Sequence, residues 1–195
     1  GVEEGEEIKV RGGGAAADLV RAVVVEVLRA GAFPRVNVGL PEMSELVYSH
    51  ASDAQLSHCS KIDLHEARSI DGMISIRAET NTRAMNKVPP SKQVLTTRAA
   101  RKIIDIIINK DRWVATLFPT AAYAQDADMS TSDFESFVAR AMFLTRSDPV
   151  GAWRELSARQ DSLRMRLDAA TTVRIVGDDT DLSLSIAGRT AINSD

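Results

Sequence analysis

Strand-like and helix-like segments alternate along most of this chain, and the alternation limits the available folds more than any other feature. Short β-branched runs bounded by glycine or proline predict strands, and apolar residues at three- and four-residue steps predict helices. The predicted strands are 8–11, 36–40, 73–77, 113–118 and 174–176. The predicted helices are 15–30, 44–58 with a break at 52–53, 62–70, 92–110, 132–144 and 148–170. Alternation of this kind indicates βαβ units, so we predict a Rossmann-like α/β fold: a mainly parallel sheet flanked by helices in three layers.

Two helix starts carry capping signals. Ser132 followed by Glu135 matches a capping box, and Asp148 before Pro149 suits an N-cap followed by the first turn. The second of these helices carries a stripe of large residues, which predicts that Trp153 is a core anchor. The stripe consists of Trp153, Leu156, Gln160, Leu163 and Leu167.

The end of the chain departs from the alternation. Segments 181–186 and 190–192 predict a β-hairpin around Ala187 and Gly188. We therefore expect 1–177 to form an amino-terminal α/β domain and 178–195 to begin the connection to a missing second domain. The chain opens on Gly1 without an initiator Met and stops directly after a strand-like run, so we expect it to be a piece of a longer protein.

Composition excludes several classes of protein. The 195 residues are 44% hydrophobic and 26% charged, which is typical of a globular protein. The formal net charge of -3 lacks the basic excess of a nucleic-acid binder, and the apolar runs are far shorter than the roughly 20 residues of a membrane span. An acidic start does not resemble a signal peptide, and a single cysteine fits a reducing compartment. We expect a cytoplasmic protein with neither nucleic acid nor membrane as a partner.

A glycine-rich turn follows the first predicted strand. Residues 12–17 (GGGAAA) match G-x-G-x-x-A, the turn that brings a pyrophosphate to a helix N-terminus in dinucleotide-binding domains. Such domains carry an acidic residue about 20 positions later, but the second strand ends at Leu40 without one, and Glu42 follows a proline. We interpret the turn from Gly12 to Ala17 as one that packs a helix close to the sheet; the alternative is a small nucleotide- or ligand-binding domain that uses this turn.

All histidines and the cysteine lie between positions 50 and 65. A catalytic zinc ion needs about three protein ligands, and a helical pair suited to one metal is four residues apart. His50 and His58 would lie about 12 Å apart along one helix, and neither His65 nor Cys59 completes a known ligand spacing. We interpret the histidines as ordinary surface or half-buried residues.

The acidic residues near the end also suit a structural role. Asp178, Asp179 and Asp181 lie between two strand-like segments, where Asp is a usual turn former, although hard cations also prefer carboxylates. Asp195 is the last residue. No charged group can be placed beside Cys59 from the sequence, and there is no P-loop or G-x-S-x-G motif. The residues alone therefore assign no catalytic, cofactor-binding or metal-ligating position.

Several blocks of sequence together carry a resemblance to a known family. They are 29–32 (RAGA), 51–56 (ASDAQL), 79–82 (ETNT), 116–120 (TLFPT), 124–125 (AQ), 129–130 (MS), 174–177 (RIVG), 180–182 (TDL) and 192–195 (INSD). In this order and spacing they resemble the aminopeptidase T and aminopeptidase S family of metallopeptidases. The resemblance covers nearly the whole chain.

The resemblance implies a function for the longer protein. Family members are cytoplasmic, two-domain, dimeric enzymes that remove amino-terminal residues from peptides. A pair of divalent metals, zinc, cobalt or similar, activates water in the carboxy-terminal domain, where Glu, His and Asp residues hold the metals and Tyr assists. The resemblance thus implies that this chain is the non-catalytic amino-terminal half, inactive alone, and that the metal ligands lie beyond Asp195.

Overall fold

The structure is a computed structural model that describes residues 1–193. The chain divides into two compact units, one covering Gly1–Glu135 and the other beginning at Ser136. Each unit is described by itself. The predicted domain boundary after Gly177 stays a prediction.

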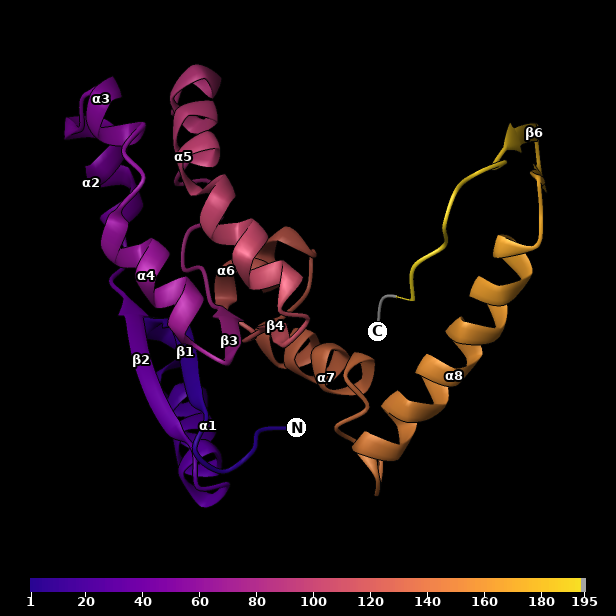
Figure 1. Cartoon of the computed structure of the whole chain (residues 1–195), viewed down its shortest axis with the longest axis horizontal. Coiled ribbons are helices and arrows are strands. Elements are labelled where there is room, and N and C mark those ends of the chain that lie inside the picture. The colour runs from indigo at the N-terminus through magenta and orange to yellow at the C-terminus, as the bar shows by residue number, and fades with distance from the viewer. Residues whose placement is uncertain (194–195) are drawn as a thin grey trace. The chain divides into compact units, whose positions relative to one another are not determined.

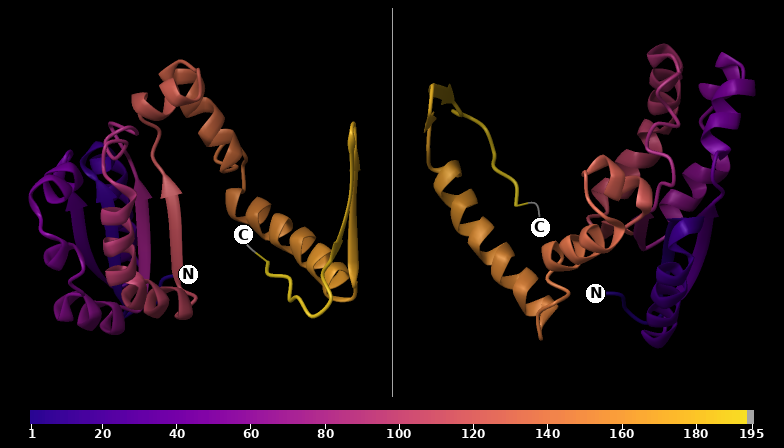
Figure 2. Two further views of the ribbon diagram at one scale, coloured as in Figure 1. Left: turned by 90° about the horizontal axis from the view of Figure 1, so that it is seen from above. Right: turned by 180° about the vertical axis from the view of Figure 1, so that it is seen from behind.

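The first unit is built on a four-stranded parallel sheet. Its strands are β1 (Glu7–Gly13), β2 (Phe33–Gly39), β3 (Gly72–Arg77) and β4 (Trp113–Leu117). Their order is β2-β1-β3-β4, and every neighbouring pair is parallel (Figures 1 and 2). The predicted α/β fold with a mainly parallel sheet is confirmed.

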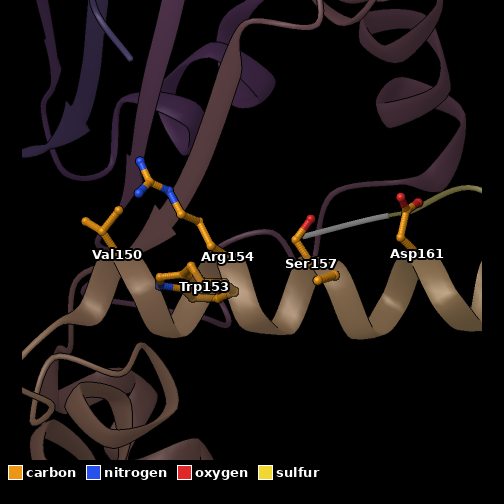
Figure 3. Close-up of a pocket in the computed structure, with 6 residues that line it drawn as sticks. Val150, Trp153, Arg154, Ser157 and Asp161 are labelled. Atoms are coloured by element: carbon orange, nitrogen blue, oxygen red, sulfur yellow. The ribbon is translucent and has the colours of Figure 1, made fainter.

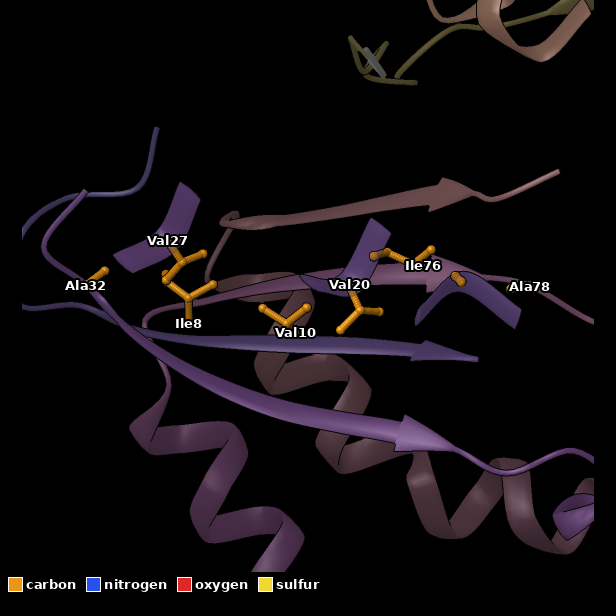
Figure 4. Close-up of a cluster of buried hydrophobic side chains, with 8 residues drawn as sticks. Ile8, Val10, Val20, Val27, Ala32, Ile76 and Ala78 are labelled. Atoms are coloured by element: carbon orange, nitrogen blue, oxygen red, sulfur yellow. The ribbon is translucent and has the colours of Figure 1, made fainter. Parts of the chain in front are cut away.

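One face of the sheet packs against α1 (Ala17–Arg29), which follows a short 3-10 turn, η1 (Gly14–Ala16). Ile8 and Val10 alternate toward this face and are 2% and 0% exposed. Val20 and Val27 of α1 pack onto them (Figure 4). Burying each such side chain contributes about 1.5–3 kcal/mol, so this cluster holds α1 against β1 along most of both elements.

Helices also cover the opposite face of the sheet. Lys9 points away from α1 and pairs with Glu66 of α4 (Lys61–Ser69), while Ala67 and Ile70 bury the adjoining apolar surface. Three further helices belong to this part of the chain: α2 (Met43–His50), α3 (Asp53–Leu56) and α5 (Pro90–Asn109). α5 contacts both α3 and α4. Ser52 and Gln55 form a capping box at the start of α3, which confirms the predicted break at 52–53.

The helices that follow β4 differ in part from the prediction. A short helix, α6 (Ala121–Asp126), was not predicted, and α7 (Thr131–Ala141) begins earlier than expected. The predicted capping box of Ser132 and Glu135 is wrong: the Oγ of Ser130 accepts the hydrogen bond from the backbone N–H of Asp133 at 3.1 Å. Both serines lie at the start of α7, and the turn at 127–130 brings the first of them into the capping position.

The second unit contains α8 (Pro149–Asp168). The carboxylate of Asp148 accepts a hydrogen bond from the backbone N–H of Gly151 at 2.8 Å, which confirms the predicted start. Trp153 is not a core anchor, because the residue is 40% exposed. Its ring contacts that of Phe143 edge-on, with the ring centroids 5.2 Å apart. Leu163 on the same stripe is 54% exposed. The stripe has helical spacing, but no layer of the described second unit covers it.

The terminal hairpin exists but pairs different segments from those predicted. β5 (Thr172–Gly177) pairs antiparallel with β6 (Thr180–Ser185). The turn is Asp178–Asp179, with Asp179 at φ 56°, a left-handed conformation that Asp tolerates better than most residues. The predicted second strand at 190–192 is wrong, since those residues form no strand. A two-residue Asp turn closes a hairpin directly, which leaves nothing for 190–192 to pair with.

Among residues 1–193, no helix is both long enough and apolar enough to cross a membrane.

Candidate functional site

The carboxyl edge of the sheet is where an α/β fold of this order would bind a ligand. The chain passes from β1 to β2 on one side and then crosses back to β3 on the other side of β1. The strand order reverses there, and ligands of open α/β sheets bind at such a point. The glycine-rich turn ends β1 there. A Cβ on Gly12 would lie 2.8 Å from Cγ2 of Val20, and one on Gly13 would lie 3.0 Å from the carbonyl oxygen of Ala78. These two glycines are therefore explained by close packing of α1 and β3.

The loop after β3 is held firmly at the same edge. The backbone N–H of Glu79 donates to Oη of Tyr123 at 3.3 Å, and its carbonyl accepts from Oγ1 of Thr120 at 2.7 Å. Thr120 is only 8% exposed. The fold thus joins two blocks that carried the family resemblance, 79–82 and 116–120, although about 40 positions separate them in sequence.

A charge pair completes this contact. The guanidinium of Arg83 donates to the carboxylate of Asp126 at 3.0 Å. Hydrogen bonds from Thr82 and Arg83 lower the pKa of Asp126 below its usual value. Together, these contacts connect the loop after β3 to α6 and shape the edge of the sheet. They do not bring a nucleophile beside a general base.

The predicted histidine and cysteine candidates are spread over three segments. His50 is the last residue of α2, His58 and Cys59 lie between α3 and α4, and His65 is within α4. Throughout residues 1–193, no group of three or more His, Cys, Asp or Glu side chains is placed to hold a metal ion.

The terminal acidic candidates belong to the hairpin. Asp178 and Asp179 form its turn. Both carboxylate oxygens of Asp181 accept hydrogen bonds from the guanidinium of Arg174, at 2.6 and 2.7 Å, and this lowers the pKa of Asp181. The predicted turn is confirmed for Asp178 and Asp179 but is wrong for Asp181, which lies in β6. Asp195 lies outside the described residues.

The second unit has a hollow of about 410 Å³ on the surface of α8. Figure 3 shows that its labelled side chains all rise from this one helix. They include Trp153, Arg154 and Asp161. Ser157 accepts a hydrogen bond from Nδ2 of Asn193 at 3.2 Å, so its hydroxyl is already engaged. A hollow lined by a single helix offers no opposing group for catalysis.

A second hollow was missed from the sequence. It lies between the α3–α4 connection and α5 and is lined by Ser57, Cys59, Leu95, Arg98, Ala99 and Lys102. Arg98 and Lys102 thus line the same hollow as Cys59. From the sequence alone, no charged residue could be assigned a position near Cys59. The four-residue spacing of Arg98 and Lys102 is visible in the sequence. The packing of α5 on α3 and α4, which brings them near Cys59, is not.

Comparison with known proteins assigns the family. The profile of the thermophilic metalloproteases, M29, matches residues 1–193. The chain belongs to this family. The expected resemblance to metallopeptidases of the aminopeptidase T type is thereby confirmed.

A solved structure shares the fold of the M29 chain. The structure of wild-type AmpT from Thermus thermophilus superposes with a TM-score of 0.68 at 19% identity. The match covers 94% of this chain but 49% of that one, so the M29 chain spans about half the length of this solved relative. No curated protein sequence matches the chain.

Membership of a metalloprotease family implies divalent metals, and the donor set of this chain can be tested for them. A hydrolytic two-metal site needs several carboxylates and imidazoles converging on ions about 4 Å apart. The described part of the M29 chain has no group of even three such side chains. Residues 1–193 therefore do not fit a metal centre, and no catalytic step can be derived from them.

Proposed function

We propose that this chain is the non-catalytic amino-terminal half of a metal-dependent aminopeptidase, a peptide hydrolase that removes amino-terminal residues. The M29 profile match over residues 1–193 carries the proposal. It is supported by the match to about half of AmpT. The absence of a metal-holding group from the described residues points the same way.

In this proposal the other half of a longer protein holds two divalent metals, zinc, cobalt or similar. The present chain contributes a rigid α/β scaffold, with the loop after β3 fastened by Thr120 and Tyr123. The longer protein is a cytoplasmic homodimer acting on peptides.

The alternative, a nucleotide- or small-ligand-binding domain using residues 12–17, has less support. The turn lacks the acidic residue that would hold a ribose. The 2.8 and 3.0 Å approaches at Gly12 and Gly13 also account for these glycines through packing alone. Titration with NADH separates the two, because the aminopeptidase proposal expects no binding at micromolar concentrations.

The activity test compares this chain with a longer protein that contains it. We expect release of leucine from a leucyl chromogenic substrate by the longer protein with zinc or cobalt, abolished by a chelator. We expect no release by the 195-residue chain above a metal-only blank. Chelator-sensitive turnover by the short chain, lost in His58→Ala or His65→Ala, would contradict the proposal.

A further inference from the structure

The hollow between the α3–α4 connection and α5 has one apolar and basic wall and one hydroxyl-bearing wall. Its volume is about 380 Å³. Leu95 and Ala99 are four positions apart, as are Arg98 and Lys102, so the two pairs lie side by side on one face of α5. Ser57 and Cys59 line the facing side. Two cations and two apolar residues of α5 therefore share this hollow with the hydroxyl of Ser57.

Among the residues that the structure describes, the ion pairs and hydrogen bonds of α5 do not use Arg98 or Lys102 to hold it against neighbouring helices. α5 carries four cations, Lys92, Arg98, Arg101 and Lys102, and one acid, Asp105. Asp105 pairs with Arg101 at 2.8 Å, and Lys92 donates to the backbone carbonyl of Tyr48 at 3.0 Å. Within residues 1–193, Arg98 and Lys102 take part in none of the ion pairs.

Arg98 and Lys102 are also four positions apart on one helix. Like charges at this spacing repel each other and destabilise a helix. An anion between them removes the repulsion and gains charge-assisted hydrogen bonds from both side chains. Arg98 and Lys102, which have no acidic partner in the described chain, can therefore bind an anion from solution.

The opposite wall adds a further favourable element. α4 begins at Lys61, directly after Cys59 and its N-cap Ser60. The positive end of a helix dipole therefore starts beside the hollow, although Asp63 in the first turn offsets part of that field.

We propose that this hollow binds a phosphate group, either as free inorganic phosphate or as part of a small phosphomonoester. The dianion matches two cations, whereas a carboxylate would leave one positive charge uncompensated. Arg98 offers a planar pair of N–H donors, Lys102 a compact ammonium, and Ser57 a hydroxyl. This site is independent of the aminopeptidase proposal, since it involves neither a metal nor a second domain.

Cys59 provides a direct readout because it lines the hollow and is the only cysteine in the chain. The rate of its alkylation by N-ethylmaleimide is followed by mass spectrometry, with inorganic phosphate or glycerol phosphate added and chloride at matched ionic strength as reference. We expect saturable protection, with alkylation slowed about threefold at a ligand concentration of about twice the Kd. The ligand that protects identifies the source of the phosphate group.

The variants decide whether protection arises in this hollow. Arg98→Gln with Lys102→Gln should abolish protection, while Arg101→Gln, on the same helix but paired with Asp105 outside the hollow, should retain it. Circular dichroism verifies that each variant is folded. Isothermal titration calorimetry with the same two ligands gives a second measure of binding. Absence of binding heat and protection in the unaltered chain, or equal protection in the double variant, would overturn the proposal.

Discussion

At the scale of single residues, glycine determines how closely the layers of the sheet approach. Gly12 allows the methyl group of Val20 to reach the backbone of β1, and Gly13 allows the end of β3 to do the same. Gly14, one position later, has no atom nearer than 3.7 Å to a built Cβ. Three adjacent glycines therefore have different tolerances, although the sequence alone makes them look equivalent.

This difference predicts the outcome of two matched substitutions. Gly12→Ala should lower the free energy of unfolding by about 1–3 kcal/mol, because α1 must move away from β1 or Val20 must leave its rotamer. Gly14→Ala should be neutral or stabilise the chain by about 0.4–1 kcal/mol through the unfolded state. Urea unfolding of both variants checks this, and equal losses at the two positions would show that α1 does not pack as described.

At the scale of elements, short polar contacts decide where helices begin. The Oγ of Ser130 accepts the N–H of Asp133 at the start of α7. At α6, the Oγ1 of Thr120 caps the helix and also donates to the carbonyl of Glu79. The Thr120 side chain thus both fixes the loop after β3 and caps α6. These two contacts help to stabilise a helix as short as α6.

Capping by Ser130 can be distinguished from capping by Ser132. Ser130→Ala should cost about 1 kcal/mol because one backbone N–H of α7 loses its acceptor. Ser132→Ala should change stability by less than about 0.5 kcal/mol, as most surface substitutions do. Thermal unfolding followed by circular dichroism measures both. A larger loss of stability for Ser132→Ala than for Ser130→Ala would instead support the capping box expected from the sequence.

At the scale of the whole molecule, the two units differ in how much apolar surface they bury. The first unit has a contiguous core around Ile8, Val10 and Val20. In the second, Ala152 is the one buried position of α8, and every residue of β6 is exposed. An isolated two-stranded hairpin is marginally stable at best, so the second unit lacks a core of its own within residues 136–193.

This contrast predicts the result of cutting the chain. A fragment ending at Ala141 keeps α7 whole and should unfold cooperatively on heating, because it retains the parallel sheet and both helical layers. A fragment from Met142 onward should show little fixed structure by circular dichroism and no cooperative transition. A cooperative melt of the second fragment alone would contradict the assignment of the core to the first unit.

Local patterns predicted most of the secondary structure of this chain. The alternation at Ile8 and Val10, the helical repeat of Val20 and Val27, and the cap at Asp148 each depend on residues a few positions apart. The predictions failed where two local solutions competed. Asp178–Asp179 outcompeted Ala187 and Gly188 as the hairpin turn, and Ser130 outcompeted Ser132 as a cap.

The sequence by itself determined the fold class and the family, because strand and helix periods and the order of short motifs are recorded in neighbouring residues. Only the tertiary structure decided which distant groups meet. It placed Thr120 and Tyr123 on Glu79, left Trp153 half exposed on α8, and set Arg98 and Lys102 opposite Ser57. Periodicity states which face of an element is apolar, but contact between elements depends on how their faces pack in three dimensions.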